Sequence, residues 1–101
     1  MKILLVCNAG MSTSLIVEKM KEYSQGNDII EAHPITYLKD HVTEWDVVLV
    51  GPQIRYKEKE VKKLCNEYGK VSGLIDMMDY GQGNGQNIYN EAQKLYKEHY
   101  E

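Results

Sequence analysis

The chain has 101 residues, 43% of them hydrophobic, which is enough for one compact domain over residues 1–101 and too little for two. Its formal charge of -3 comes from 15 acidic and 12 basic residues with no dense Lys/Arg block, so nucleic acid is not an expected partner. The longest apolar run, Ile3 to Val6 followed by Cys7, is far shorter than the roughly 20 residues that cross a bilayer, and it lacks the features of a signal peptide. We therefore expect a cytoplasmic protein without direct membrane insertion.

The first half of the chain alternates between strand-like and helical patterns. Residues 3–6 are a short run of branched apolar residues, which is typical of a strand covered on both faces in a parallel sheet. Residues 12–23 change to a helical period. Residues 29–35 predict a second strand, and because Pro34 cannot donate a backbone hydrogen bond, we expect this strand at a sheet edge. The helical period of residues 12–23 places four side chains on one face of the helix: Leu15, Ile16, Met20 and Tyr23.

The second half continues the alternation. Residues 37–44 are ambiguous and fit a helical turn, whereas residues 45–50 predict a third strand that is buried on both faces. Residues 57–68 have the period of an amphipathic helix, which Gly69 ends. Residues 71–75 predict a fourth strand, which a glycine-containing loop joins to a last helix. The apolar faces of these two helices carry Val61, Leu64, Cys65 and Tyr68 in the first, and Ile88, Ala92, Leu95 and Tyr96 in the second.

Strands that alternate with helices favour an α/β fold, with a four-stranded parallel sheet and helices on both of its faces. In such sheets, ligands bind at the carboxyl ends of the strands. Cys7, Gly51 and residues 76–80 all end or follow predicted strands, so we expect them at the same edge of the sheet. The glycine-rich residues 81–85 resemble a phosphate loop, but entry into the last helix explains them more simply.

The cysteines and histidines show no pattern of a metal site. Cys7 and Cys65 are expected to be free thiols in a reducing compartment, because no CxxC pair or Cys/His cluster with metal-ligand spacing is present. Cys65 falls on an apolar helix face, where a packed thiol is expected. We predict no metal and no cofactor. The three histidines are expected at the surface, away from the loop after Cys7: His33, His41 and His99.

The loop after the first strand, residues 8–14, has the chemistry of an anion site. Backbone N–H groups at a helix N-terminus lack intrahelical partners and carry a partial positive charge. Gly10 allows the backbone to curl around an oxyanion. We expect a thiol beside these donors to ionise more readily than a free cysteine, which makes Cys7 a nucleophile for phosphorus. Three hydroxyl side chains add further donors: Ser12, Thr13 and Ser14.

Three other interpretations stay open from these residues. Cys7 could be a small buried residue at the end of a core strand, with Ser12 or Thr13 only capping the helix. A thiolate in a phosphate loop also suggests a low-molecular-weight phosphatase or an arsenate-reductase-like enzyme, although tyrosine phosphatases have an Arg at the position of Thr13 and an Asp-Pro acid that is absent here. A non-catalytic domain that senses anions is the third.

Three segments of the chain resemble a known family. The segments "KILLVCNAGMSTSLIVEKM" (2–20), "DVVLVGPQIRY" (46–56) and "IDMMDYGQGNG" (75–85) are similar to the IIB component of the bacterial sugar phosphotransferase system, in its lactose/chitobiose/cellobiose class. The resemblance covers essentially the whole chain. It implies a fold similar to that of low-molecular-weight tyrosine phosphatase, with the strand order 2-1-3-4.

The resemblance implies a sugar phosphotransferase that works through phosphocysteine, without metal or nucleotide. A phosphohistidine on the IIA protein would donate to Cys7, which would pass the group to a sugar bound by the membrane permease IIC. We expect a β-linked disaccharide as the sugar, and a monomer that makes transient contacts with its partners. The residues that match the family's phosphate loop are Asn8, Ala9, Gly10, Met11, Ser12, Thr13 and Ser14.

Two further groups match the family beyond the third and fourth strands, and they are candidates for docking a partner. The first comprises Gln53, Arg55 and Tyr56. The second comprises Asp79 and Tyr80. The alternative role for Arg55 is a solvated charge at the start of the next helix, and the alternative for Asp79 is to orient the loop.

Overall fold

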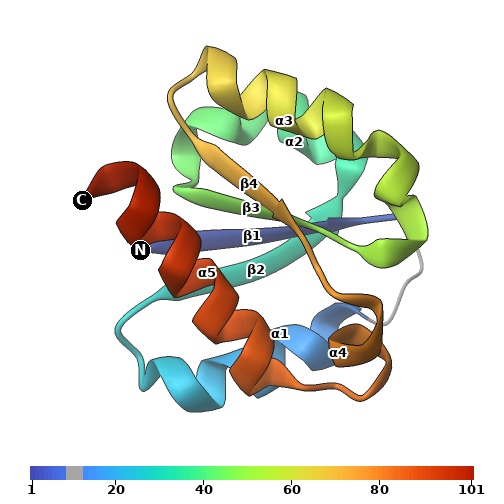
Figure 1. Cartoon of the computed structure of the whole chain (residues 1–101), viewed down its shortest axis with the longest axis vertical. Coiled ribbons are helices and arrows are strands. Elements are labelled where there is room, and N and C mark those ends of the chain that lie inside the picture. Colours follow the sequence, from blue (N-terminus) through green and yellow to red (C-terminus); the bar gives the residue numbers. More distant parts are fainter. Residues whose placement is uncertain (9–12) are drawn as a thin grey trace.

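The computed structural model of the chain describes residues 1–8 and 13–101. Four parallel strands form one sheet in the order β2-β1-β3-β4 (Figure 1). The predicted α/β class, the parallel pairing and the strand order 2-1-3-4 are thereby confirmed. The strands are β1 (Lys2–Cys7), β2 (Ile29–Pro34), β3 (Val47–Val50) and β4 (Val71–Leu74).

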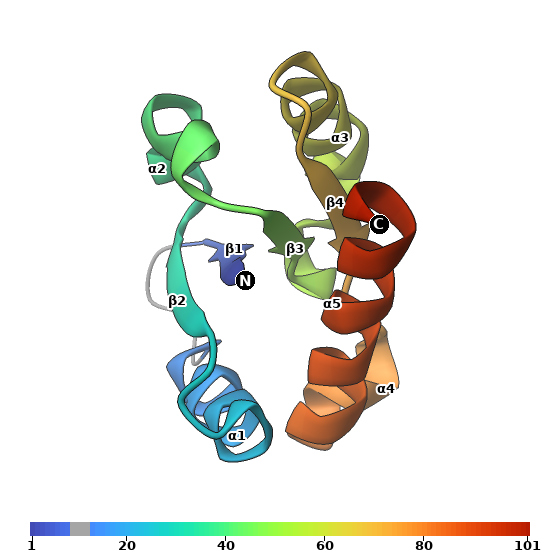
Figure 2. The same cartoon turned by 90° about the vertical axis from the view of Figure 1, so that its left-hand side faces the viewer.

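Helices cover both faces of this sheet, as Figure 2 shows from the side. One face carries α1 (Thr13–Ser24), α4 (Met77–Gly81) and α5 (Gly85–Tyr100). The other carries α2 (Ile35–His41) and α3 (Glu58–Glu67). Two 3-10 segments, η1 (Val42–Glu44) and η2 (Pro52–Lys57), flank β3 in the chain. Among the described residues, no helix has both the length and the apolarity to cross a membrane.

The central strands β1 and β3 separate two hydrophobic cores, one on each face of the sheet. Because side chains alternate along a strand, Ile3 and Leu5 pack toward α1 and α5, whereas Leu4 and Val6 pack toward α2 and α3. All four side chains are 0% exposed. The four residues of β3 alternate in the same way and are also buried. The prediction that these two strands are covered on both faces is confirmed.

The outer strand β2 begins and ends close to where the sequence predicts it. Pro34 is its last residue and pairs with Cys7 of β1, so the expected edge position is confirmed. Ile35 already belongs to α2, because the fixed backbone angle of Pro34 suits the residue before a helix. The ambiguous segment 37–44 is helical throughout, divided between α2 and η1.

The buried face of α1 differs from the predicted one. Leu15 is 66% exposed and Tyr23 is 47% exposed, although the helical period placed both in the core. The face that packs against β2 and α5 instead includes polar side chains that find local hydrogen bonds. Ser24, for example, donates to the Lys21 carbonyl at 3.3 Å, which removes much of the cost of its burial. The buried residues of α1 are Thr13, Ile16, Val17, Met20 and Ser24.

The ends of α3 and α5 lie close to the predicted positions, and the predicted apolar face of α5 is confirmed, because Ile88 and Ala92 are buried and Leu95 and Tyr96 pack against the core. Gly69 follows α3 with a φ of +70°, as a helix-ending glycine should. Tyr68, which the helical period placed on the apolar face, lies beyond the end of α3 and is 50% exposed. Asn84 caps α5 by accepting a hydrogen bond from the Asn87 amide at 3.0 Å, which agrees with a helix entry at residues 81–85.

Helix α4 was not predicted, because the glycines after β4 indicated a loop. Its start is stabilised by Asp76, whose carboxylate accepts hydrogen bonds from the amides of Met78 and Asp79 at 2.9 and 3.0 Å. Gly81 is its last residue, and Gly85 is the first residue of α5 rather than part of the loop. This short helix is what brings residues 77–80 to the carboxyl edge of the sheet.

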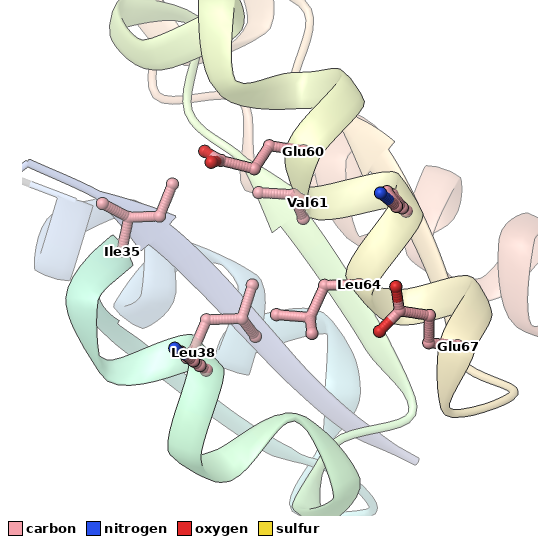
Figure 3. A pocket seen from close by; sticks show the side chains of 8 residues that line it. Ile35, Leu38, Glu60, Val61, Leu64 and Glu67 are labelled. Atoms are coloured by element: carbon pink, nitrogen blue, oxygen red, sulfur yellow. The ribbon is translucent and has the colours of Figure 1, made fainter.

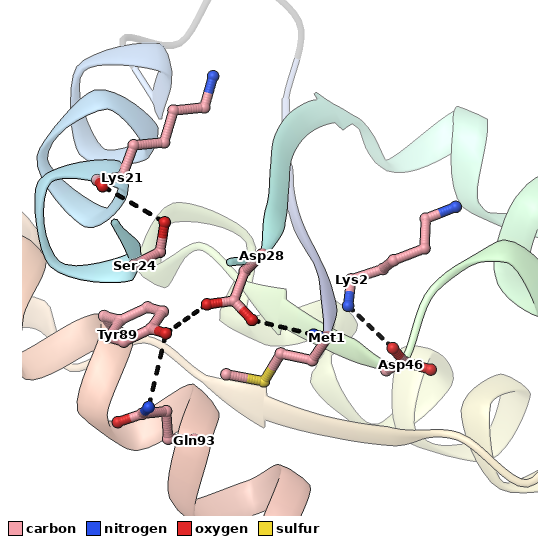
Figure 4. Close-up of polar contacts among 8 residues, drawn as sticks. All are labelled: Met1, Lys2, Lys21, Ser24, Asp28, Asp46, Tyr89 and Gln93. Atoms are coloured by element: carbon pink, nitrogen blue, oxygen red, sulfur yellow. Dashed lines mark hydrogen bonds and ion pairs between the residues drawn. The ribbon is translucent and has the colours of Figure 1, made fainter. Parts of the chain in front are cut away.

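A buried polar cluster joins β1, the segment before β2 and α5 (Figure 4). The Asp28 carboxylate accepts hydrogen bonds from the Met1 amino group at 2.9 Å and from the Tyr89 hydroxyl. The Gln93 amide in turn donates to the Tyr89 oxygen at 3.5 Å. The Met1 and Asp28 side chains are only 6% and 8% exposed, so this ion pair is shielded from solvent. Nearby, the Lys2 amide donates to the Asp46 carboxylate at 2.8 Å.

The environment of Tyr89 predicts a contribution to stability that is lost at alkaline pH. Burial, and secondarily the hydrogen bond to Asp28, raise the pKa of Tyr89 from 10.0 to about 12. Its stabilising effect is therefore complete below pH 10.0 and disappears as the pH rises through about 12. We expect Tyr89→Phe to flatten the fall in the free energy of unfolding across this window, measured by urea denaturation at each pH.

Part of the fall in the free energy of unfolding with rising pH should remain in the Tyr89→Phe protein. Burial also raises the pKa of Tyr100 to about 12 and that of Cys65 to about 11, so both contribute over overlapping ranges. In the double variant Tyr89→Phe, Tyr100→Phe, the free energy of unfolding should fall less with pH than in either single variant. An identical slope in the wild-type and Tyr89→Phe proteins would contradict the role assigned to the Asp28 contact.

The contact between α1 and α5 depends on Gly85. A Cβ atom at this position would lie 2.5 Å from the carbonyl carbon and the Cβ of Lys19, and 2.8 Å from its carbonyl oxygen. We expect Gly85→Ala to lower the free energy of unfolding by about 1–3 kcal/mol, because the two helices must separate. Gly81→Ala is the matched control, since nothing lies within 4 Å of its Cβ position, and a change within about 0.5 kcal/mol is expected. Equal losses in urea denaturation of the two variants would refute this packing argument.

Candidate functional site

The carboxyl ends of β1, β3 and β4 meet at one edge of the sheet, where Cys7 is the last residue of β1. The Gly51 amide, directly after β3, donates to the Val6 carbonyl at 3.0 Å. A Cβ atom added at Gly51 would lie 4.0 Å from the Cβ of Cys7, so the two positions are neighbours at this edge. The Ile75 amide donates to the Val50 carbonyl at 2.9 Å, which brings the chain after β4 to the same edge. The predicted convergence of these segments is confirmed.

Cys7 is almost enclosed, with 7% of its surface exposed. Its Sγ atom lies 3.8 Å from the carbonyl oxygen of His33, a distance at which a thiol can donate a hydrogen bond. The two strands are in register here, with Val6 opposite His33 and Cys7 opposite Pro34. The backbone of β2 therefore forms one side of the thiol's surroundings, a contact between distant residues that no local sequence pattern predicts.

The imidazole of His33 takes no part in these surroundings. Its ring stacks on Tyr37 of α2, with 3.9 Å between ring centroids, and its Nε2 lies 2.8 Å from a Glu31 carboxylate oxygen. His41 stacks on the other side of Tyr37 at 4.0 Å, and His99 is exposed near the end of α5. The side chains of His33 and His41 thus lie beside α2, and that of His99 lies on α5, as expected for groups outside the thiol site.

The structure places part of the predicted phosphate loop. Asn8 is exposed directly after Cys7, and Thr13 and Ser14 begin α1. Ser14 is exposed, whereas Thr13 is 1% exposed and its Oγ1 lies 3.4 Å from the Tyr80 hydroxyl. The remaining predicted residues of the loop lie outside the described residues: Ala9, Gly10, Met11 and Ser12.

The segment η2 presents the first group of candidate docking residues. Ile54 is 0% exposed and anchors η2 to the core, so its neighbours in the chain point outward. Arg55 is exposed and Tyr56 is 70% exposed. Arg55 does not open the next helix, because α3 begins only at Glu58. Gln53 folds back toward the sheet, since its Oε1 lies 3.2 Å from the Cβ position of Gly51.

A surface groove of about 680 Å³ separates η2 from α4 near the Cys7 edge. Sequence reasoning missed that the methionines of α4 are exposed: Met77, which lines this groove, is 59% exposed, and the next residue, Met78, is 69% exposed. Two adjacent methionines in a five-residue helix cannot both face a core, which is the signal that could have indicated this surface. The groove is lined by Pro52, Gln53, Arg55, Tyr56, Met77, Tyr80 and Gly81.

The second candidate group, on α4, forms hydrogen bonds within the chain. The Asp79 carboxylate accepts from the Asn87 side-chain amide at 3.0 Å, which directs it toward α5. The Tyr80 hydroxyl reaches Thr13 at the start of α1. Asn87 was not singled out from the sequence, because its partner is eight residues away and on a helix that was not predicted.

A different groove lies between α2 and α3, with a volume of about 360 Å³ (Figure 3). Apolar side chains from both helices form its floor, and two lysines and two glutamates surround it. None of the residues that the sequence singled out for the thiol site lines this groove. Its residues are Ile35, Leu38, Lys39, Glu60, Val61, Lys63, Leu64 and Glu67.

The second thiol has no access to solvent. Cys65 is 0% exposed in the core beneath α3, and burial raises its pKa to about 11, so the prediction of a packed thiol is confirmed. Within residues 1–8 and 13–101, no group of three or more His, Cys, Asp and Glu side chains has the geometry of a metal site.

Known proteins match this chain over nearly all of its length. The family described as "PTS system, Lactose/Cellobiose specific IIB subunit" matches residues 2–91. An oligo-beta-mannoside-specific EIIB component of Bacillus subtilis is 42% identical over 97 residues, which cover 93% of this chain and 94% of the relative. A cellobiose-specific EIIB component of Lactococcus lactis is 35% identical over 101 residues, covering 92% and 94%.

Solved structures show the same architecture. The solution structure of a cellobiose-specific phosphotransferase IIB component from Borrelia burgdorferi superposes with a TM-score of 0.81 at 36% identity, covering 98% of this chain and 94% of that one. A lactose-specific IIB domain from Streptococcus pneumoniae superposes with a TM-score of 0.84 over 95% and 97% of the two chains. At 16% identity, this second similarity concerns the fold alone.

Proposed function

The chain belongs to the lactose/cellobiose-specific IIB family of the sugar phosphotransferase system, and on that premise we propose that it carries a phosphoryl group on Cys7. The group arrives from a phosphohistidine of the IIA protein and leaves to a sugar bound by the membrane permease IIC. The observation that supports this most is the position of Cys7 at the carboxyl end of a central strand, where the chain after β3 also arrives, directly before the segment that leads into α1.

Each transfer exchanges one bond to phosphorus for another. In the first, the bond from phosphorus to the imidazole nitrogen breaks, the bond to the Cys7 sulfur forms, and the thiol proton passes to the imidazole. In the second, the sulfur–phosphorus bond breaks, a sugar hydroxyl oxygen forms the new bond to phosphorus, and the hydroxyl proton passes to the Cys7 sulfur as it leaves. Such transfers depend chiefly on in-line positioning and on donors for the equatorial oxygens. The near-enclosure of Cys7, at 7% exposure, suits the positioning requirement.

Residues 8–14 supply the donors in this proposal. Unpaired amides at the start of α1 favour an anion, and phosphorylation raises the charge on the sulfur-bound group to nearly -2. Asn8 and Ser14 border the site as exposed residues, and the buried Thr13 marks the first turn of α1. Ala9, Gly10, Met11 and Ser12 complete the predicted phosphate loop.

The surroundings of Cys7 favour holding the group over hydrolysing it. Thr13, at the position where tyrosine phosphatases have an Arg, is buried and contacts Tyr80, so it offers no positive charge to a transferring phosphate. The sugar is proposed to be a β-linked oligosaccharide, by analogy with relatives named for oligo-beta-mannosides and cellobiose.

The docking surface for IIA or IIC is proposed to be the outer side of η2. Arg55 and Tyr56 are exposed on η2, which the buried Ile54 anchors, and the Gln53 side chain lies beside Gly51. The sequence hypothesis also included Asp79 and Tyr80, which lie across the groove on α4. Their hydrogen bonds to Asn87 and Thr13 favour a supporting role for these two side chains.

Replacement of the thiol tests the proposed carrier. We expect Cys7→Ser to abolish phosphoryl acceptance and to retain the fold, because the hydroxyl matches the thiol in size but ionises far less readily at neutral pH. The measurement is intact-mass analysis after incubation with phosphorylated IIA, followed by peptide mapping. Cys65→Ser is the matched control and should accept the group as the wild type does. Labelling of Cys7→Ser at the wild-type rate, or mapping to another side chain, would exclude the proposal.

Removal of one exposed charge tests the docking surface. We expect Arg55→Ala to raise the half-saturating concentration of phosphorylated IIA by about two- to fivefold, the range for an exposed ion pair. Lys62→Ala, which removes an exposed cation from α3, is the control and should leave transfer kinetics unchanged. Identical saturation curves for wild-type and Arg55→Ala proteins would remove Arg55 from the proposed surface.

A further inference from the structure

Two surface grooves meet at α4. The larger, of about 680 Å³, lies between η2 and α4, and Met77, Tyr80 and Gly81 line its α4 side. The second, of about 330 Å³, lies between α4 and α1, where Leu15 is one of its lining residues. Tyr80 and Gly81 line both grooves, so the grooves adjoin each other over α4. Together the two grooves form the α4 surface.

The α4 surface exposes large apolar side chains from three separate elements. Leu15 of α1 is 66% exposed, Met77 of α4 is 59% exposed and Tyr56 of η2 is 70% exposed. Each of them lines one of the two adjoining grooves. Apolar side chains scattered singly over a surface need no explanation, but a cluster of them beside hollows in the surface is typical of a site that a protein partner covers.

The charged side chains of the α4 surface are cationic. Arg55 lines the groove toward η2, and Lys19 lines the groove toward α1. Among the described residues, no carboxylate lines either groove, although the whole chain has a net charge of -3. The groove between α2 and α3, by contrast, has two glutamates beside its two lysines. The α4 surface is therefore complementary to an apolar partner surface that carries negative charge.

The position of this surface beside the thiol narrows the choice of partner. Pro52, which lines the larger groove, directly follows Gly51, and the positions of Gly51 and Cys7 are neighbours at the carboxyl edge of the sheet. A phosphoryl donor must bring its phosphorus atom within bonding distance of the Cys7 sulfur. The donor protein must then cover the surface next to Cys7, which is where the larger groove begins.

We propose that the α4 surface is the docking site of the phosphorylated IIA protein, with Met77 and Leu15 as apolar anchors and Arg55 and Lys19 as charge contacts. This inference rests on the proposed function, and it extends the docking surface from η2 across α4 to α1. A phosphorylated donor adds negative charge that suits these cations, whereas the sugar bound by IIC is uncharged. A second copy of this chain would bring the same cations, so charge opposes self-association through this surface.

The experiment measures phosphoryl transfer from phosphorylated IIA to Cys7 in a set of variants. Met77→Gln keeps the length of the side chain and replaces its apolar end by an amide. Met78→Gln is the matched control, because Met78 belongs to the same helix and is 69% exposed but lines neither groove. Leu15→Gln tests the groove toward α1. The maximal rate and the half-saturating concentration of phosphorylated IIA are measured for each variant.

Docking predicts weaker saturation at an unchanged maximal rate. We expect Met77→Gln and Leu15→Gln each to raise the half-saturating concentration about five- to tenfold, because the partner no longer buries about half of an apolar side chain. Met78→Gln should saturate as the wild type does. Because one partner covers both grooves, the variant with both Met77→Gln and Leu15→Gln should need a higher concentration than either single variant.

The charge contacts predict a dependence on salt. We expect Lys19→Ala to raise the half-saturating concentration about two- to fivefold at low salt, and this difference should shrink as added salt screens exposed charges. Lys21→Ala is the control on the same helix, since the Lys21 ammonium lies 3.6 Å from the Glu18 carboxylate and Lys21 lines neither groove. The Lys21→Ala protein should follow the wild-type saturation curve at both salt concentrations.

The remaining outcomes overturn the inference. Equal saturation curves for the Met77→Gln and Met78→Gln proteins would remove the α4 surface from IIA docking. Unchanged transfer from IIA, together with slower transfer from the Met77→Gln phosphoprotein to sugar in vesicles that contain the permease, would assign this surface to IIC. A dimer in sedimentation that Met77→Gln dissociates would assign it to a second copy.

These three outcomes would leave Cys7 as the proposed carrier. Absence of phosphate on Cys7 of the wild-type protein would instead refute the proposed function, and the docking role of the α4 surface with it.

Discussion

The backbone pairing of β1 between β2 and β3 is the constraint on which the rest of the molecule depends. It holds the sulfur of Cys7 beside the His33 carbonyl of β2, while the Gly51 amide after β3 donates to the carbonyl of Val6, the residue before Cys7. The apolar residues of β1 stabilise this arrangement on both faces of the sheet. A flexible loop alone would have to order its nucleophile at each encounter with a partner, whereas this strand keeps the thiol ordered throughout.

The two thiols show how position decides what a cysteine can do. Cys65 lies among apolar side chains on the α3 side of the sheet, where burial raises its pKa to about 11 and keeps it protonated. Cys7 lies at the end of its strand and retains a small exposed surface. Cys65 is enclosed on the inner side of α3, whereas Cys7 ends a strand at the edge of the sheet, so their places in the fold decide their different exposure.

The sequence was most informative where a pattern is repeated locally. The apolar runs of β1 and β3, the edge position imposed by Pro34 and the entry into the last helix at residues 81–85 all follow from short stretches of residues. The buried face of α1 could not be read in this way, because the approach of α5 at Gly85 decides which side chains of α1 are covered. The Tyr80–Thr13 contact was equally hidden, since it joins distant residues through a helix that the glycines after β4 concealed.

The end of β2 has a consequence for how molecules of this kind behave at high concentration. An open sheet edge can recruit a strand from another molecule and begin an aggregate. Pro34 deprives that edge of one donor at the position opposite Cys7, and Glu31 adds a carboxylate on the same strand. A strand from another molecule would therefore find one donor missing at Pro34 and a carboxylate nearby, which discourages intermolecular sheet growth at that end of β2.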